Sequence, residues 1–308
     1  MAALRTGFKV ASLGAVGAGV AYTGYQYYTT TQFFFVRAHA ELPSDSKAAL
    51  KKMEWKGFTE LKLQSSEQVN HNVKKLTFAL PDDDSITGIT PITSLLTQHT
   101  PDGGFIPVFR PYTPVSDNDI AGTVTFMIKK YPGGKGSGKM HSLVPGDTMK
   151  FKPLQEFEYK PNQFKSMLFV AGGSGITPIY QLTRAILKNP EDKTKISLVY
   201  ANNTEEDILL RQEFEELERQ YPDRFQKLFT VSKLNQANDG SIAQGYVTKQ
   251  MINKIWAGKE AGQKVLVSGP PAMVEAIAGA KGGFGWTQGS VGGILKELGY
   301  TKEDVHKF

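Results

Sequence analysis

The chain has 308 residues, of which 40% are hydrophobic and 21% charged, so it is long enough for two folded domains and is not expected to be disordered. Cysteine is absent and the five histidines are scattered, which excludes disulfides and thiolate chemistry and leads us to predict no metal site. The net charge is +6, without a basic stripe interleaved with aromatics, so nucleic-acid binding is not expected.

Residues 1–40 are predicted to be a targeting segment and membrane anchor. Residues 10–36 form an uncharged run between Lys9 and Arg37 that is long enough for one membrane span, and tyrosines gather near its end as interfacial residues do. A basic start without acids is typical of a mitochondrial presequence. We therefore expect a single-pass anchor in the mitochondrial outer membrane, with an additional processed form in the intermembrane space. A secretory signal peptide and an untargeted tail are the alternatives.

Residues 54–160 are predicted to form a small antiparallel β-barrel domain. Short apolar runs alternate here with proline and glycine punctuation, which is typical of strands joined by turns. In residues 123–131, Val124, Phe126 and Ile128 alternate with Thr125, Met127 and Lys129, so that one face is core and the other meets solvent or ligand. The candidate strands are 58–63, 73–80, 105–112, 123–131 and 148–151.

Residues 164–308 are predicted to form an α/β domain with a parallel sheet. Apolar strands alternate with amphipathic helices, an order that places ligands at the carboxyl ends of the strands. Residues 279–293 are rich in glycine and are predicted to form a loop. The candidate strands are 167–171, 196–201, 225–231 and 265–268, and the candidate helices are 177–188, 205–220, 247–256 and 271–280.

The motif at residues 110–116 ends a predicted strand with three groups suited to a phosphorylated ligand that carries a flat ring. Arg110 can pair with a phosphate, Tyr112 can lie against the ring or its chain, and Thr113 can hydrogen-bond a ring nitrogen. The same residue types also suit an ordinary strand end, and the residues by themselves leave both interpretations open.

Two glycine-rich turns are candidate phosphate sites. In residues 172–178 a buried strand runs through glycines into a helix, which exposes backbone N–H groups and the positive end of the helix dipole. Pro178 stands where the dinucleotide fingerprint has its third glycine, so a plain strand-to-helix connection remains open. Residues 133–137 are predicted to be a flexible loop that closes over phosphates, with a solvated hairpin turn as the alternative.

Five motifs in order resemble the NADH-cytochrome b5 reductase family, a group of ferredoxin reductase-like flavoproteins. They are Arg-Pro-Tyr-Thr-Pro-x-Ser, Gly-Gly-Lys-x-Ser, Ala-Gly-Gly-x-Gly-Ile-Thr-Pro, Ala-Asn-x-Thr-Glu-x-Asp-Ile-Leu-Leu-Arg and Gly-Pro-Pro-x-Met, within about residues 54–308. With its leader and its C-terminal Val-His-Lys-Phe, the chain is most similar to the fungal mitochondrial type.

The resemblance implies an enzyme (EC 1.6.2.2) that transfers a hydride from NADH to FAD and then single electrons to cytochrome b5 or a similar haem protein. It implies catalytic roles at Thr113 and Ser268, next to the reacting atoms. The residues implied to bind FAD or NADH are Arg110, Pro111, Tyr112, Thr113, Met127, Lys129, Lys135, Gly136, Ser137, Gly172, Gly173, Ser174, Thr177, Gly269 and Pro270. The alternatives are an NAD(P)H-dependent quinone or ferric reductase on the same fold, and a non-catalytic membrane-tethered nucleotide-binding protein.

The chain departs from the family pattern at two positions. Ser268 stands where the family usually has cysteine beside the nicotinamide, and Gly136 stands where it often has methionine. Since the chain has no thiol, we predict that thiol-alkylating reagents leave its activity unchanged. Time-dependent inactivation by such a reagent, blocked by NADH, would contradict this prediction.

NADH is predicted as the donor in preference to NADPH. The loop after the second parallel strand carries Glu205, Glu206 and Asp207 without a cation, which disfavours the additional phosphate of NADPH. Lys233 after the third strand stands where related flavoproteins bind the additional phosphate of NADPH, and so favours NADPH. The acidic Asp239 nearby favours NADH again. Lys51, Lys52, Lys160 and Lys165 are surface cations that can steer an acidic partner or simply face solvent.

Overall fold

The computed structural model of the protein describes residues 50–234, 240–283 and 287–308. The predicted targeting segment and Asp239 lie outside the described residues. Within the described ranges, every helix is too short or too polar to span a bilayer.

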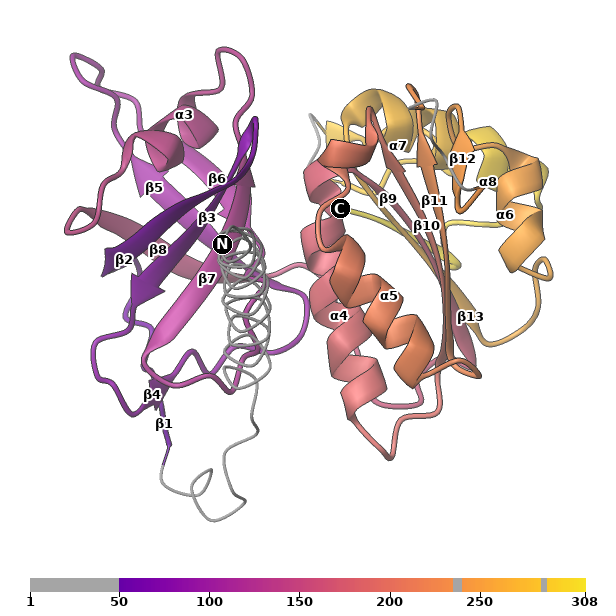
Figure 1. Cartoon of the computed structure of the whole chain (residues 1–308), viewed down its shortest axis with the longest axis horizontal. Helices are drawn as coiled ribbons and strands as arrows, with labels where there is room; N and C mark the ends of the chain where they lie inside the picture. Colours follow the sequence, from indigo (N-terminus) through magenta and orange to yellow (C-terminus); the bar gives the residue numbers. More distant parts are fainter. Residues whose placement is uncertain (1–49, 235–239, 284–286) are drawn as a thin grey trace, which may run out of the picture. The chain divides into compact units, whose positions relative to one another are not determined.

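The N-terminal half is built on a six-stranded antiparallel sheet with the strand order β6-β5-β8-β2-β3-β7 (Figure 1). The antiparallel pairing predicted for this half is therefore confirmed, whereas the ladder order of the described residues is that of an open sheet and not of the closed barrel that was predicted. No ladder joins the edge strands β6 and β7 in the described part of the chain, and α3 contacts both of them as well as β5. The strands are β2 (Thr59–Asn70), β3 (Val73–Ala79), β5 (Thr93–His99), β6 (Val108–Tyr112), β7 (Thr123–Lys129) and β8 (Thr148–Gln155), with a two-stranded annex of β1 (Lys51–Lys52) and β4 (Ser85–Ile86).

The core of this half is formed by the inward faces of the strands. Three aromatic rings, Phe78, Phe126 and Phe151, pack at its centre with ring centroids 4.9–5.9 Å apart. The predicted alternation in β7 is present, because Val124, Phe126 and Ile128 are buried while the intervening side chains are only partly buried. Strand β7 therefore turns one face to the core and the other to the cavity described below.

Two elements of this half differ from the prediction. Strand β5 was not predicted, because its buried residues include Thr93, Ser94 and Thr97, whose polar side chains hide the alternation of a strand. The expected flexible loop at 133–137 is wrong at its C-terminal part, where Lys135–Ser142 forms helix α3. Tertiary contacts outweigh the poor helix propensity of glycine here, since Gly136 and Met140 are buried against the sheet.

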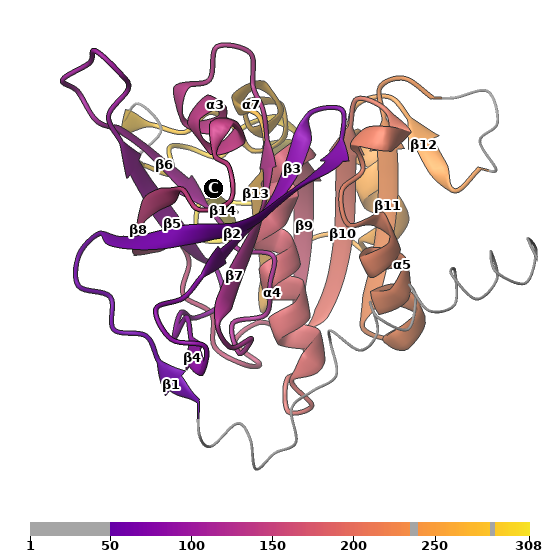
Figure 2. The ribbon, with the colours of Figure 1, turned by 60° about the vertical axis from the view of Figure 1, so that its left-hand side comes forward.

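The C-terminal half is a parallel sheet of six strands with the order β12-β11-β10-β9-β13-β14 (Figure 2). The chain leaves β9 in one direction and later returns to place β13 on its other side. The carboxyl ends of β9 and β13 thus flank a topological switch point, where ligands bind in open α/β sheets. The strands are β9 (Ser166–Gly172), β10 (Lys195–Asn202), β11 (Phe225–Val231), β12 (Ile242–Gln244), β13 (Gln263–Ser268) and β14 (Val305–Lys307).

Helices cover both faces of the parallel sheet (Figures 1 and 2). One hydrophobic core lies between the sheet and helices α4 and α5, and a second lies between the other face and helices α6, α7 and α8. The sequence predicted the parallel sheet and its alternation of strands and helices but not the short elements α8, β12 and β14. The helices are α4 (Ile176–Lys188), α5 (Arg211–Gln220), α6 (Lys249–Ile255), α7 (Pro271–Ala278) and α8 (Gly293–Glu297), and the 3-10 turns are η1 (Gly173–Gly175) and η2 (Glu205–Asp207).

The predicted helix at 205–220 is interrupted in the structure. Turn η2 ends at Asp207, and three buried residues follow before α5 begins. The last of them, Leu210, has φ +58°, a left-handed conformation that no continuous α-helix contains. The backbone N–H of Leu209 donates to the hydroxyl of Tyr200 at 3.3 Å, so the sheet core holds the break in place.

A buried lysine organises the glycine-rich segment that follows α7. The side chain of Lys307 is 2% exposed, and its Nζ donates to the carbonyl oxygens of Gly279, Ala280 and Ser290 at 3.2, 3.0 and 2.9 Å. These bonds satisfy carbonyl groups that a loop without regular structure leaves unpaired. The predicted loop is thereby anchored to the C-terminal strand β14.

Candidate active site

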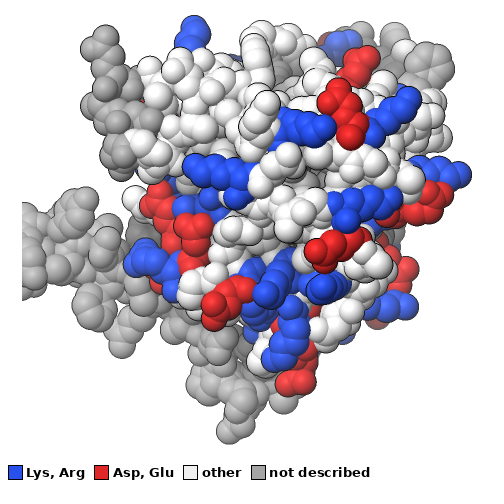
Figure 3. Space-filling view, turned by 90° about the vertical axis from the view of Figure 1, so that its right-hand side faces the viewer, with Lys and Arg blue, Asp and Glu red and all other residues white. Residues whose placement is uncertain are grey.

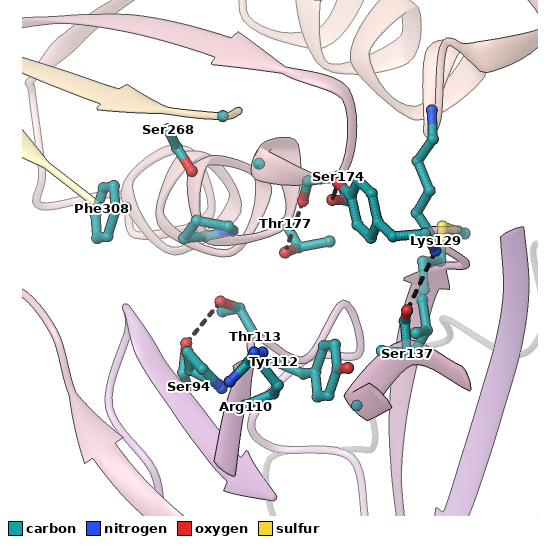
Figure 4. Close-up of a pocket in the computed structure, with 18 of the residues that line it drawn as sticks. Ser94, Arg110, Tyr112, Thr113, Lys129, Ser137, Ser174, Thr177, Ser268 and Phe308 are labelled. Atoms are coloured by element: carbon teal, nitrogen blue, oxygen red, sulfur yellow. Dashed lines mark hydrogen bonds between the residues drawn. The ribbon is translucent and has the colours of Figure 1, made fainter. Parts of the chain in front are cut away.

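A cavity of about 520 Å³ is lined by residues of both sheets (Figure 4). Ser94, Thr113 and Arg110 approach it from the antiparallel sheet, and Ser174, Thr177 and Ser268 approach it from the parallel sheet. Predicted site residues on the cavity wall are Arg110, Pro111, Tyr112, Thr113, Met127, Lys129, Gly136, Ser137, Ser174, Thr177, Ser268, Gly269 and Pro270. Those not on the wall are Lys135, Gly172 and Gly173.

The end of β6 supplies the polar wall on the antiparallel side. The Nη1 of Arg110 donates to the carbonyl oxygen of Phe109 at 2.7 Å, which uses one of the five N–H donors of the guanidinium. Burial raises the pKa of Tyr112 to about 12, although the charge of Arg110 opposes this shift. The phenol of Tyr112 therefore stays protonated at physiological pH and can donate a hydrogen bond into the cavity.

Helix α3 closes this wall with its N-terminal turn. The Oγ of Ser137 accepts a hydrogen bond from the backbone N–H of Tyr131 at 3.1 Å, which fixes the turn before the helix. A Cβ added to Gly136 would lie 2.5 Å from the Cγ of Arg110 and 3.3 Å from the hydroxyl oxygen of Tyr112. Glycine at 136 thus allows the guanidinium stem and the phenol to pack directly on the backbone of the helix.

The opposite wall consists of two turns at the carboxyl ends of β9 and β13. A Cβ added to Gly175 would lie 2.5 Å from the carbonyl oxygen of Ser268 and 2.7 Å from the nitrogen of Gly269, so the two turns touch through their backbones. Ser268 is buried at the end of β13, and Figure 4 shows its side chain directed into the cavity across from Thr113. The predicted pair Thr113 and Ser268 therefore stands on opposite walls of one cavity.

Lys129 lines the cavity and also ties the two halves together. Its Nζ lies 3.1 Å from the Oδ1 of Asp207 in η2, and both side chains are largely buried. Burial by itself would raise the pKa of Asp207, but the hydrogen bond and charge of Lys129, with help from Thr204 and His71, lower it below its usual value. The carboxylate of Asp207 is therefore paired with Lys129. We had expected its charge to repel the additional phosphate of NADPH, but this pairing neutralises it.

Replacing Lys129 by methionine is expected to lower the free energy of unfolding by about 3 kcal/mol at neutral pH, because it leaves a buried carboxylate without its partner. The pKa of Asp207 is lower in the folded protein than in the unfolded chain, where an aspartate has a pKa near 3.9. The ionised carboxylate therefore stabilises the fold above this pH, and the stabilisation is lost as the pH falls through the folded-state pKa. The free energy of unfolding, measured by urea titration at a series of pH values, should therefore fall more steeply with acidification in wild type than in Lys129→Met.

His71→Gln is the matched control for this prediction. The Nε2 of His71 lies 3.8 Å from the same carboxylate oxygen of Asp207, but its side chain is 60% exposed. An exposed pair contributes at most about 1 kcal/mol. Equal destabilisation by both variants would show that Asp207 is not held by Lys129.

Several residues of the cavity wall were not predicted. One is Tyr131, whose hydroxyl oxygen lies 2.8 Å from that of the predicted Ser174 and joins the two halves beside the cavity. The aromatic ring of the C-terminal Phe308 also lines it (Figure 4). Ser94 and Glu156 lie behind Thr113, and since β5 itself was missed, no sequence signal pointed to Ser94.

The wall residues fit a flavin nucleotide. The cavity volume lies within the range of about 300–1,000 Å³ that is common for cofactor sites. Arg110 and the N-terminal turn of α3 provide the cation and backbone N–H groups that a diphosphate requires. Tyr112 offers a ring surface and Thr113 a buried hydroxyl for a flat heterocycle, and the turns at Gly175 and Ser268 leave an opposing wall for a second nucleotide.

Two family models match separate parts of the chain. The family model described as "Oxidoreductase FAD-binding domain" matches residues 60–159, and that described as "Oxidoreductase NAD-binding domain" matches residues 169–279. The first range contains the antiparallel sheet, and the second contains most of the parallel sheet.

Individual relatives extend over nearly the whole chain. The chain is 45% identical over 307 residues to NADH-cytochrome b5 reductase 2 of Pyricularia oryzae, with 99% of this chain and 90% of that relative covered. It is 40% identical to the protein of the same name from Emericella nidulans, with coverage of 96% and 89%.

Solved structures show the same two-part architecture. The cytochrome b5 reductase domain of Ulva prolifera nitrate reductase superposes with a TM-score of 0.71 at 28% identity, covering 83% of this chain and 98% of that chain. The CS-b5R domains of human Ncb5or, in the NAD+ form, give a TM-score of 0.64 at 20% identity, covering 82% and 69%, which shows the fold alone.

Proposed function

The chain belongs to the NADH-cytochrome b5 reductase family, and from this premise we propose that it takes a hydride from NADH onto FAD and delivers single electrons to cytochrome b5 or a similar haem protein. The observation that carries the proposal is the single cavity in which Thr113 from the FAD-binding half faces Ser268 from the NAD-binding half. Bound FAD supplies the chemistry, since a flavin can accept two electrons as a hydride and return them one at a time.

The chain's own residues bind and orient the two nucleotides. Arg110 and the first turn of α3 would hold the FAD diphosphate, while Tyr112 and Thr113 would contact the ribityl chain and the ring. The turns around Gly175 and Ser268 would hold the nicotinamide in the same cavity and would exclude water from it, because hydride transfer requires the donor carbon close to its acceptor in a dry site. The hydroxyl of Ser268 serves as the polar contact at the position where the family has a thiol.

NADH remains the proposed donor, because the loop after β10 carries acidic side chains and no basic one. Glu205 in this loop pairs with Arg211 at 3.7 Å, and Asp207 pairs with Lys129. Lys233 is exposed after β11. Steady-state kinetics with both donors test the preference, and a higher kcat/KM for NADPH would refute it.

Surface lysines were the candidates for steering an acidic electron acceptor. Three of the four lysines first considered for steering are paired with acids: Lys51 with Asp84, Lys160 with Glu158 and Lys165 with Glu260. The face of the molecule seen in Figure 3 also carries cations and acids interspersed, so it presents no field of one sign. These lysines and this face therefore give no support for electrostatic steering of an acidic partner.

Acceptor kinetics distinguish this function from its main competitor. With saturating NADH, cytochrome b5 should be reduced with a kcat/KM at least tenfold above that for quinones or ferric chelates. The reverse order would favour a quinone or ferric reductase on the same fold. A chain that binds NADH without turning over any acceptor would instead be a membrane-tethered nucleotide-binding protein.

We also propose that residues 1–40 anchor the protein in the mitochondrial outer membrane, with a processed form in the intermembrane space. The support is the uncharged run of residues 10–36 and the absence of acids before Glu41. In fractionated cells, the full chain should resist carbonate extraction from outer membranes, whereas a variant with three lysines introduced in this run should not. Secretion of the full chain would contradict the proposal.

A further inference from the structure

A chain of hydrogen bonds connects Thr113 on the cavity wall, through Ser94, to the carboxyl group of Glu156. The Oγ1 of Thr113 lies 2.9 Å from the Oγ of Ser94, and the Oγ of Ser94 donates to the Oε2 of Glu156 at 2.5 Å. Figure 4 shows Thr113 and Ser94 side by side on the lower wall. Three side chains, from the residue after β6, from β5 and from the residue after β8, are thus connected in series.

The direction of these bonds depends on the charge of Glu156. A serine hydroxyl carries one proton. When Glu156 is ionised, Ser94 gives its proton to the carboxylate and accepts from Thr113, so that Thr113 presents a lone pair to the cavity. When Glu156 is protonated it can donate to Ser94, Ser94 then donates to Thr113, and Thr113 presents its O–H to the cavity. The charge of Glu156 therefore decides whether Thr113 is an acceptor or a donor.

The proposed reaction demands such a reversal. An oxidised flavin offers an acceptor at its reactive ring nitrogen, and after hydride uptake the same nitrogen is an N–H donor. The balance of the whole reaction is NADH plus two ferric haems giving NAD+, two ferrous haems and one proton. That proton originates in the hydride and has to leave the buried site.

We propose that Glu156, acting through Ser94 and Thr113, is the proton carrier of the cycle: it receives the proton as electrons leave for the acceptor and releases it to solvent when the next hydride arrives. Each cycle thus moves one proton outward through bonds the structure already contains. This inference rests on the proposed function.

The surroundings of Glu156 suit a carboxyl group that changes its charge. Burial raises the pKa of Glu156, which the Ser94 bond and the charge of Lys281 only partly offset. Glu156 is partly exposed and itself lines the cavity. Other charged groups on the cavity wall are Arg110 and Lys129, while Lys281 faces Glu156 from the segment after α7.

The experiment measures protons released when the FAD-loaded full chain is reduced anaerobically by NADH, with an indicator dye in weak buffer. Hydride transfer alone releases none, so a proton that appears in this half-reaction reports the carrier. Wild type should release up to one proton per flavin at pH values between the pKa of Glu156 in the reduced protein and its higher pKa in the oxidised protein, and less on either side of this range. Glu156→Gln and Ser94→Ala should release none, although both retain their flavin.

Glu158→Gln is the matched control, because Glu158 lies two residues away with an exposed side chain paired to Lys160. It should behave as wild type. If Glu156→Gln does not fold, the infrared difference spectrum of wild type labelled with ¹³C-glutamate decides the matter: reduction should remove a protonated carboxyl band that shifts with the label.

Two failures are distinguishable. A colourless protein, or a flavin that NADH does not reduce, overturns the proposed function and this inference with it. A yellow protein that NADH reduces, but whose proton release is the same in wild type and Glu156→Gln, overturns the carrier alone.

Discussion

Gly175→Ala should slow the reduction of bound FAD by NADH about 100-fold, since a misplacement of about 1 Å in a hydride-transfer site has an effect of this size. The added methyl group would lie 2.5 Å from the carbonyl oxygen of Ser268 and 2.6 Å from its carbonyl carbon, both of them backbone atoms. The turn after β9 and the turn after β13 would have to separate. Stopped-flow absorbance under anaerobic conditions measures the rate.

Gly138→Ala is the control for this substitution. Its Cβ would meet nothing within 4 Å, and Gly138 lies in the middle of α3 with an ordinary helical φ. Alanine there should stabilise the helix by about 0.5–1 kcal/mol and leave the reduction rate unchanged. A Gly175→Ala enzyme reduced within a factor of two of wild type would show that contact between the two turns does not position the donor.

Arg184→Met should lower the free energy of unfolding by about 3 kcal/mol or more and increase the loss of FAD on dialysis. Arg184 in α4 is 8% exposed, and its Nη1 donates to the carbonyl oxygen of Val115 at 3.1 Å while its Nη2 pairs with Asp117. Val115 and Asp117 directly follow the strand end that carries Tyr112 and Thr113. Removing the guanidinium leaves a partly buried carboxylate and detaches this strand end from the parallel half.

Lys188→Met tests the same carboxylate from its exposed side. The Nζ of Lys188 lies 2.6 Å from the Oδ2 of Asp117, but 46% of the lysine side chain is exposed. An exposed pair of this kind contributes about 0–1 kcal/mol. Urea unfolding and flavin content should therefore separate the two variants clearly, and equal effects would refute the assigned role of Arg184.

Much of the site was accessible from the sequence because its residues lie in short continuous motifs. Arg110 to Thr113 end one strand, and the turns after β9 and β13 each occupy a few consecutive residues. The hydrophobic periods that predicted a parallel sheet also indicated that these turns lie at its carboxyl edge. Long apolar strands such as β9 and β11 were placed to within one residue of their ends.

What escaped prediction depends on contacts between distant segments. Ser94 and Glu156 are 62 positions apart and meet only because β5 pairs with β8. Strand β5 buries polar residues, one of which, Ser94, lines the cavity. These polar residues interrupt the alternation of apolar and polar side chains by which a strand is predicted. Likewise, the commitment of Asp207 to Lys129 joins residues 78 positions apart, which no local pattern records. The helix of α3 was missed because packing, and not propensity, forms it.

The central claim, that the two sheets hold one flavin to which NADH donates, is tested most directly by the visible spectrum of the purified full chain during anaerobic addition of NADH. We predict a yellow protein whose flavin absorbance is bleached by one equivalent of NADH and returns when cytochrome b5 is added. A protein that remains colourless after refolding with FAD, or whose bound flavin is unaffected by NADH, would contradict the account.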